Sequence, residues 1–330
     1  MREGSSRLFR PPTNQQRTPP KFHQRTRTET VVRHRYCPRG MPRRSTADLS
    51  EAVVQGFGEE WQTFDHGSMA QGELQSLFDA YFKSFPWSDL PPDAVGFDAG
   101  SGSGRWASLV APRVKTLHLI DASDSAMAVA RDRLAESPNA RFNVVPLELV
   151  GRDDLGTVHG CDFGYCLGVL HHLADPSAAL ARCVDLLKPD APFLIYVYHA
   201  LEHLPGWQRV AWKVSDVLRR GICRLRRRPR LWVTGMIALT VYLPLSRAAR
   251  LIEIVGLDPS RMPLAAYRRR SLYVLRNDAL DRFGTSVEKR FTRSGLFEFL
   301  AQAGLDRIEV LDGHPWLVLA RKVAERPDPV

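Results

Sequence analysis

Residues 95–107, Val-Gly-Phe-Asp-Ala-Gly-Ser-Gly-Ser-Gly-Arg-Trp-Ala, decide the fold of this 330-residue chain. A short apolar strand ends at Asp98, and Gly100, Gly102 and Gly104 then lead into a predicted helix. Glycine allows positive φ and a close approach of the backbone to a ligand. The N-terminus of the following helix offers unpaired N–H groups to an anionic group. The placement of this turn between a strand and a helix predicts a ligand site.

Strands and helices alternate along the chain from this turn onward. The pattern predicts strands at residues 94–98, 116–120, 141–145, 162–167, 193–198, 307–311 and 316–321. It predicts helices at residues 70–85, 105–111, 123–135, 177–187 and 293–303. A short turn at residues 312–315, Asp-Gly-His-Pro, joins the last two strands and indicates an antiparallel hairpin. We therefore expect an α/β fold with a doubly wound, mostly parallel seven-stranded sheet, an antiparallel C-terminal hairpin and a helical insertion.

Five segments follow from this pattern. We expect a disordered basic tail at 1–45, the first part of the α/β domain at 46–199, a helical cap for the substrate at 200–290, the last helix and hairpin of the domain at 291–323, and a tail at 324–330. The net charge of +10 belongs to the first segment, which holds 12 Lys/Arg against two Glu. The remainder is neutral, so nucleic acid is not the expected partner.

The tail at residues 1–45 has no core-forming pattern. It could be an arm that binds nucleic acid or membrane, or an organelle-targeting peptide. The favoured alternative is translated upstream sequence, with Met41 as the start, or a tail without function, because organised sequence begins just after Met41. Five cysteines without a Cys-x-x-Cys pair, and the lack of a secretory signal, predict a cytoplasmic protein.

The glycine turn distinguishes between two ligand classes. A dinucleotide turn reads Gly-x-Gly-x-x-Gly, but its third glycine position, counted from Gly100, is Arg105. This departure disfavours hydride transfer. Asp121 ends the second strand, where a carboxylate can accept hydrogen bonds from two ribose hydroxyls. The alternative role for Asp121 is to cap the next helix.

Four motifs together resemble the class I S-adenosylmethionine-dependent methyltransferases. They are residues 97–107 (FDAGSGSGRWA), 119–121 (LID), 167–173 (LGVLHHL) with Asp175-Pro176, and 186–189 (LLKP). The resemblance implies S-adenosylmethionine as cofactor. It implies that Asp98 and the backbone of Gly100, Ser101, Gly102 and Gly104 hold the methionine portion, that Asp121 binds the ribose, that Ala122 lies at the adenine, and that Leu167 lies by the methionine amino group.

The sequence departs from the family in two places on the cofactor side. Pro146 stands where relatives usually carry an acid for the adenine amine, and Ala122 replaces a bulky aliphatic residue. Methyl transfer itself needs alignment of acceptor and methyl group more than it needs chemical groups. A general base is required only for a protonated acceptor, and His172, just past the fourth strand, is the candidate. The alternative for His172 is a local structural role. No metal site is expected.

The insertion is expected to select the substrate. Seven arginines lie within residues 219–230 without an acid, and an apolar run of 16 residues, 231–246, follows. That run contains Gly235 and Pro244 and is shorter than a spanning helix requires. Upstream, Val210, Val214, Val217 and Leu218 mark one apolar helical face.

Three interpretations of the insertion remain open. Residues 219–243 could contact an anionic membrane surface peripherally, on its inner side. The favoured alternative is a helical cap that packs its apolar side on the body and turns its arginines to solvent. The third is a basic groove for RNA. We predict a methyltransferase for a small-molecule or lipid-linked acceptor; the alternatives are an RNA methyltransferase and a non-catalytic relative that binds the cofactor or a partner.

Overall fold

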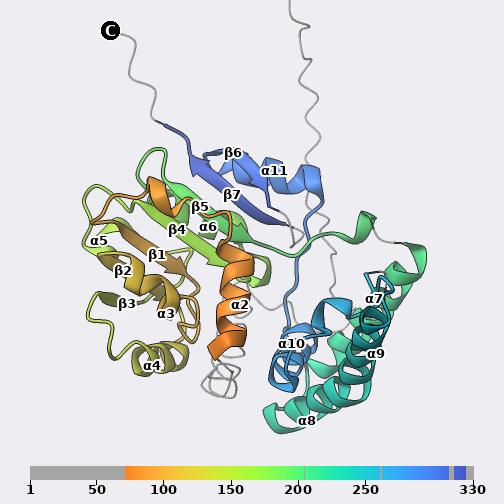
Figure 1. Ribbon diagram of the computed structural model, residues 1–330. Coiled ribbons are helices and arrows are strands. Elements are labelled where there is room, and N and C mark those ends of the chain that lie inside the picture. Colours follow the sequence, from red (N-terminus) through yellow and green to blue (C-terminus); the bar gives the residue numbers. More distant parts are fainter. Residues whose placement is uncertain (1–70, 204, 261, 312–315, 325–330) are drawn as a thin grey trace, which may run out of the picture. The chain divides into compact units, whose positions relative to one another are not determined.

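Figure 1 shows the computed structural model of the chain, which describes residues 71–203, 205–260, 262–311 and 316–324. All of them belong to one compact unit of the chain. The predictions for residues 1–45 lie outside the described residues.

Seven strands form one mixed sheet in the order β3-β2-β1-β4-β5-β7-β6. They are β1 (Val95–Ala99), β2 (Thr116–Asp121), β3 (Ala140–Val144), β4 (Phe163–Leu167), β5 (Pro192–Tyr196), β6 (Leu305–Val310) and β7 (Leu317–Lys322). The first five are parallel, and β7 pairs antiparallel with both β5 and β6. The predicted fold class is confirmed. The strand order reverses between β1 and β4, which is where a doubly wound sheet opens its ligand crevice.

Helices cover both faces of the sheet, as Figure 1 shows. One face packs against α2 (Gln71–Phe82), α3 (Ala107–Val110) and α4 (Asp124–Arg133). The other packs against α5 (Arg152–Leu155), α6 (Pro176–Asp185) and α11 (Arg293–Gln302). Alternation along the strands separates the two cores, since Ile120 joins one and Leu119 the other. The sheet is thus buried on both sides, and its C-terminal edge remains for ligands.

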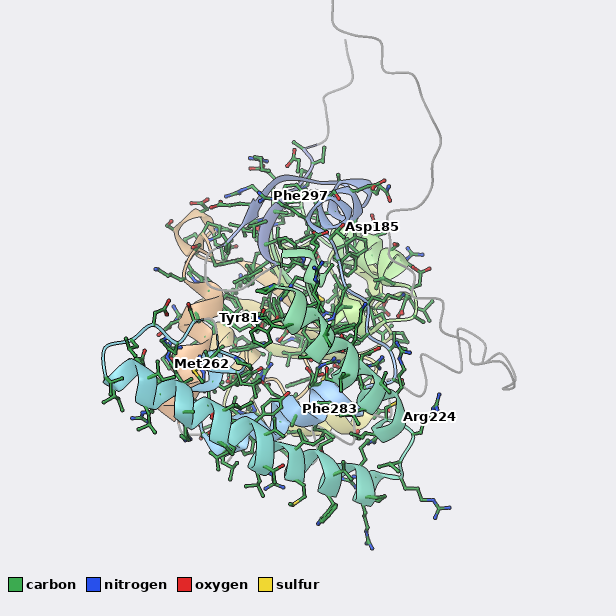
Figure 2. The ribbon with its side chains drawn as sticks, turned by 90° about the vertical axis from the view of Figure 1, so that its right-hand side faces the viewer. Tyr81, Asp185, Arg224, Met262, Phe283 and Phe297 are labelled. Carbon is green, nitrogen blue, oxygen red and sulfur yellow. The ribbon has the colours of Figure 1, made fainter. Side chains whose placement is uncertain are left out.

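The insertion between β5 and α11 is helical. Its elements are α7 (Gly206–Ile222), α8 (Arg227–Ile237), the π turn η5 (Ala238–Tyr242), α9 (Leu243–Ile254), the 3-10 turn η6 (Ala265–Tyr267) and α10 (Leu272–Gly284). Both α7 and α8 pack on α10, and these three helices with η5 enclose a small core of their own. In Figures 1 and 2, α7 and the continuous α8–α9 helix lie on the same side of α10.

Two expectations about the insertion are wrong. The apolar run is not too short to span a membrane, because one continuous 28-residue helix, Arg227–Ile254, contains it and is long and apolar enough. The five-residue π turn ends at Tyr242, two residues before Pro244, so the helix continues through the proline after a local change in its hydrogen-bond pattern. Only 22% of the apolar window of this helix is buried in the protein.

The second error concerns the direction in which α7 faces. We expected the insertion to pack its apolar side on the body and to turn its arginines to solvent. Helix α7 shows the reverse on its apolar side, because Val210, Val214 and Val217 are exposed while Asp216 and Arg219 are buried. Four arginines between α7 and the start of α8, at positions 224 and 226–228, are exposed as expected. Arg219 pairs with Asp216 and donates to the carbonyl oxygen of Thr285 at 2.9 Å, so hydrogen bonding fixes the polar side inward.

Candidate functional site

The glycine turn between β1 and α3 has three residues with positive φ. The φ angles of Gly100, Gly102 and Gly104 are 75°, 53° and 69°, values that residues with a side chain rarely adopt. A Cβ at Gly100 would lie 2.4 Å from a side-chain carbon of Val169, in the loop after β4. Because Gly100 has no side chain, the turn packs closely against the loop after β4. The glycines therefore allow both the positive φ values and this close packing.

Asp121 at the end of β2 is hydrogen-bonded to this turn. Its Oδ2 accepts a hydrogen bond from the N–H of Gly102 at 2.9 Å, and its Oδ1 accepts from the N–H of Ser123 at 2.8 Å. Burial raises the pKa of the Asp121 carboxyl, although both N–H groups oppose the rise. Because a carboxylate has about four acceptor positions, Asp121 retains capacity for further donors. Ala122 lies beside it, half-buried.

Asp98 lies at the base of the turn and is 1% exposed. Burial raises the pKa of its carboxyl to about 8, and the neighbouring Asp121 adds to the rise, whereas the Tyr165 hydroxyl opposes it. Asp98 Oδ2 and Ser101 Oγ are buried and have no hydrogen-bond partner in the part of the chain that the structure describes. The charge of Arg105 lowers the pKa of Asp98 too little to offset its burial.

The predicted cofactor residues come together at the C-terminal edge of the sheet. Strand β1 pairs with β2 on one side and with β4 on the other, which brings Asp98, Asp121 and Leu167 to neighbouring strand ends. Leu167 is buried, and Gly168 follows it with a φ of 84°. The residues present fit the cofactor that the resemblance implies, because the partnerless polar atoms and the glycine cradle suit a ligand with cationic groups.

A cluster of aromatic and imidazole rings adjoins this edge. His171 stacks on Tyr198 with ring centroids 3.8 Å apart, and His172 lies edge-on to Tyr198 at 5.5 Å. His172 Nδ1 lies 2.8 Å from the carbonyl oxygen of Val287, which assigns the proton to Nδ1 because a carbonyl only accepts. Both histidines are almost fully buried. Burial lowers the pKa of His171 well below its usual range, so this ring is neutral.

Two carboxyls of α10, Asp278 and Asp281, complete the cluster. Asp281 accepts a hydrogen bond from the Tyr198 hydroxyl at 2.6 Å, and its Oδ1 lies 3.5 Å from Nε2 of His172. Burial raises the pKa of Asp278 to about 6, and the charge of Asp281 adds to the rise, while the Tyr267 hydroxyl opposes it. Nothing in the sequence distinguished these two acids from the other polar residues of the insertion.

Arg105 connects the glycine turn with this cluster. Its charge opposes the burial-driven rise in pKa at Asp98, Asp278 and Tyr81. Burial raises the pKa of the Tyr81 hydroxyl, on α2, to about 12. Tyr81 also packs edge-on against Tyr196 at 5.5 Å. The proposed cofactor site and the cluster are therefore neighbours in space, although they come from segments almost 200 residues apart.

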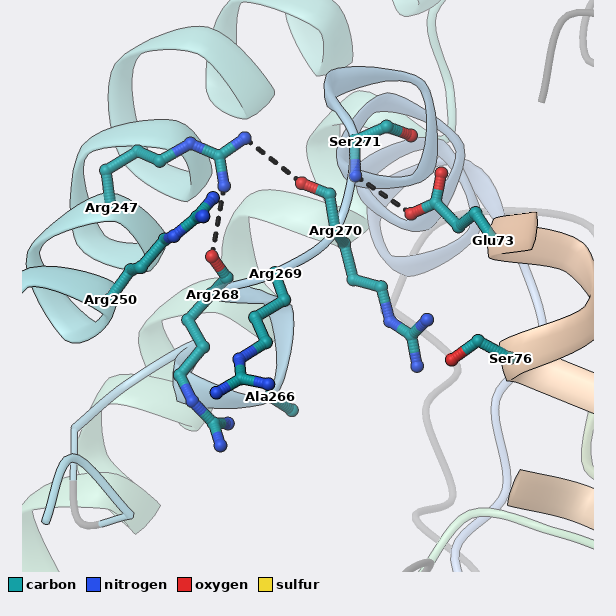
Figure 3. A pocket seen from close by; sticks show the side chains of 9 residues that line it. All are labelled: Glu73, Ser76, Arg247, Arg250, Ala266, Arg268, Arg269, Arg270 and Ser271. Atoms are coloured by element: carbon teal, nitrogen blue, oxygen red, sulfur yellow. Dashed lines mark hydrogen bonds between the residues drawn. The ribbon is translucent and has the colours of Figure 1, made fainter. Parts of the chain in front are cut away.

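A pocket of about 580 Å³ lies between α2, α9 and the loop before α10 (Figure 3). Five arginines line it: Arg247, Arg250, Arg268, Arg269 and Arg270. Arg247 donates to the carbonyl oxygens of residues 268 and 270, and Glu73 accepts from the N–H of Ser271. The excess of guanidinium groups over carboxyls makes this pocket suitable for an anionic group.

Comparison with known proteins gives matches over part of this chain. Residues 97–193 match a family model described as a methyltransferase domain. A ubiquinone biosynthesis O-methyltransferase of Thiobacillus denitrificans is 34% identical over 108 residues, which cover 31% of this chain and 45% of that protein. One from Pseudomonas fluorescens is 26% identical over 123 residues, covering 36% and 52%. The chain thus spans about half the length of these curated relatives.

Solved structures include similar chains. A 1,6-didemethyltoxoflavin-N1-methyltransferase of Burkholderia thailandensis matches 87% of this chain and 94% of its own, with 16% identity and a TM-score of 0.48. A methyltransferase-fold protein of Bacillus halodurans matches 77% of this chain and 100% of its own, with 13% identity and a TM-score of 0.44.

Proposed function

We propose that this chain, whose residues 97–193 match a model of a methyltransferase domain, transfers a methyl group from S-adenosylmethionine to a small-molecule or lipid-linked acceptor. The observation that carries the proposal is the glycine turn with buried Asp98 at the strand-order reversal, within the matched residues 97–193.

The cofactor side of the proposal rests on three groups. The carboxyl of Asp98, with its raised pKa, ionises when a cationic ligand group lies beside it, and it thereby holds the methionine end. The spare acceptor positions of Asp121 take the ribose hydroxyls, as nicotinamide enzymes do with an acid at this position. The positive φ of Gly100, Gly102 and Gly104 keeps the backbone open to the ligand. The bound cofactor supplies an activated sulfonium methyl group.

The acceptor side of the proposal is the ring and carboxyl cluster beside the turn. Tyr81, Tyr196 and Tyr198 present ring faces and edges that suit a flat or apolar acceptor. Holding such an acceptor against the turn provides the alignment that in-line methyl transfer needs. Burial also raises the pKa values of Tyr196 and Tyr198 well above their usual range, so both hydroxyls stay protonated, and the Tyr198 hydroxyl donates a hydrogen bond to Asp281.

Asp278 is the proposed general base if the acceptor loses a proton. Its pKa of about 6 leaves the carboxylate mostly ionised at neutral pH, yet basic enough to accept a proton. His172, the candidate from the sequence, is 1% exposed and contacts Asp281 and the carbonyl of Val287. We therefore assign His172 a positioning role, in which its Nδ1–H ties the turn after β4 to the carbonyl of Val287.

The arginine pocket favours an acceptor that carries an acidic group. It adjoins the cluster, because the charge of Arg270 opposes the burial-driven rise in pKa at both Tyr81 and Asp278. A carboxylate or phosphate in the pocket would leave the rest of the acceptor directed toward Asp278. Arg270→Gln should then raise KM for the acceptor about tenfold without changing cofactor affinity.

Calorimetric titration with S-adenosylmethionine tests the cofactor site, with Asp98→Asn as the variant expected to bind weakly. Incubation with a methyl-labelled cofactor and cell extract, followed by mass spectrometry, then identifies the labelled product. Label in RNA would favour the RNA methyltransferase instead. Tight cofactor binding without labelled product in any fraction would favour the non-catalytic relative. Failure to bind the cofactor at all would refute the proposal.

A further inference from the structure

The outer faces of α7 and the α8–α9 helix are apolar and exposed. In Figure 2 both helices lie across the front of the molecule, on the side away from α10. We call the following exposed residues the apolar cap face: Trp207, Val210, Val214, Val217, Leu218, Trp232, Met236, Leu239, Leu251, Ile254 and Val255. Monomeric soluble proteins rarely expose so large a set of neighbouring apolar side chains, and such sets mark interaction sites.

Helix α7 is inverted with respect to a helix of a soluble domain, whose apolar face normally packs inward. Its inward face is polar and satisfied: Ser215 Oγ accepts a hydrogen bond from Arg282 of α10 at 2.8 Å, and Arg219 donates to the carbonyl oxygen of Thr285, just after α10, at 2.9 Å. Because these bonds hold the polar face against α10, the apolar face is directed outward by the fold itself. Rotation of α7 in place would break them.

The α8–α9 helix also exposes large apolar side chains. Its buried side carries four small residues, Thr234, Ala238, Ser246 and Ala249, together with Tyr242. Small residues on this side allow close packing against α10 and η6, while Trp232 on the outer side is 68% exposed. Large side chains outside and small ones inside are the distribution expected of a helix that contacts lipid on its outer surface.

The charge around the apolar cap face identifies the occupant. Residues 206–257 contain 11 Lys/Arg and only two acids, Asp216 and Glu253. Both acids already pair with arginines of the protein: Asp216 with Arg219, and Glu253 with Arg268. The charge left over on this side of the molecule is therefore positive. Apolar helices with tryptophan, bordered by arginines, fit an anionic lipid surface.

We propose that the apolar cap face docks on the surface of an anionic lipid bilayer, with α7 and the α8–α9 helix lying in the plane of the interface. An in-plane position follows from the packing on α10. The α8–α9 helix packs on α10, which carries the polar residues Asn277, Asp278 and Asp281. A spanning position of the α8–α9 helix would therefore bring these residues into the hydrocarbon core.

Vesicle co-sedimentation of the full chain tests the docking. We expect binding to phosphatidylcholine vesicles that contain phosphatidylglycerol, little binding to pure phosphatidylcholine, and loss of binding at high salt. The triple substitution Arg226→Gln, Arg227→Gln and Arg228→Gln should lower partitioning onto anionic vesicles about 100-fold, since each arginine near such a surface contributes about fivefold. Trp232→Glu should lower it about tenfold or more.

Leu149→Glu is the matched control, because Leu149 is 71% exposed, like Trp232, but lies in the loop after β3. It should leave vesicle binding unchanged. Equal binding to neutral and anionic vesicles, or an equal loss in the control, would overturn the proposal. Absence of vesicle binding would also overturn it. If the protein is then an oligomer that Trp232→Glu converts to a monomer, the apolar cap face is a protein interface. Cofactor titration of the same variants keeps this test separate from the proposed function.

Discussion

Asp98 offers the sharpest test of the site, because the same burial that suits it to a cationic ligand destabilises the ligand-free protein. Its folded-state pKa is about 8, against an ordinary value of 3.8. Between these two values the folded state binds the proton more tightly than the unfolded state does. The Asp98 contribution to the free energy of unfolding therefore falls as pH rises from about 4 to about 8, and it stays constant above that.

The expected magnitude follows from that difference. Each pKa unit corresponds to about 1.4 kcal/mol, so the cost at pH 7 approaches ~4 kcal/mol as an upper estimate. Asp98→Asn removes the ionisation and should stabilise the ligand-free protein by up to that amount at pH 7, but little at pH 4.5. The same variant should bind S-adenosylmethionine more weakly, because a neutral amide replaces the carboxylate.

Urea denaturation of both proteins at pH 4.5, 6, 7 and 8.5 measures the effect, since their difference isolates the titration of Asp98 from that of other groups. The difference in free energy of unfolding should grow with pH and level off above about pH 8. A difference that does not change with pH, or a variant less stable than the parent at pH 8.5, would refute the reasoning.

Three further substitutions probe the neighbouring groups. Asp121→Ala should weaken cofactor binding by ~1.5–3 kcal/mol, measured by calorimetry, because charge-assisted hydrogen bonds are lost. Gly100→Ala should abolish cofactor binding and lower the melting temperature, because its Cβ would lie 2.4 Å from Val169; an unchanged calorimetric titration would contradict the cradle. Asp278→Asn should remove an ionisation near pH 6 from the pH profile of kcat, whereas His172→Gln should retain that ionisation and lower only the plateau rate.

The sheet and the glycine turn could be predicted because their signals are local. Alternation of strands and helices needs only neighbouring residues, and the turn is read from three glycines after Asp98. Boundaries moved slightly, as with the last strand, which begins at Leu317 instead of residue 316. The close approach of Gly100 to Val169 could not be predicted, because it depends on the pairing of β1 with β4.

The insertion shows where local signals fail. The periodicity of Val210, Val214 and Val217 correctly indicated an amphipathic α7, but periodicity does not determine which face packs inward. That direction depends on partners far away in sequence, since Arg219 reaches the carbonyl of Thr285. The proposed role of Asp278 as a general base likewise depends on its nearness to Tyr267 and Asp281. That nearness leaves no recognisable pattern in the sequence.

Helix α10 is shared by the proposed reaction site and the proposed membrane face. Asp278 and Asp281 carry its contribution to the cluster beside the glycine turn, whereas Leu275, Ala279 and Phe283 pack into the core that supports α7 and α8. Helix α10 therefore connects the apolar cap face with the acceptor side of the proposed site. The glycine turn lies on the sheet instead, where the N–H groups of Gly100 and Gly102 bond to β2. Substitutions in the apolar cap face that disturb α10 should therefore alter acceptor binding more than cofactor affinity.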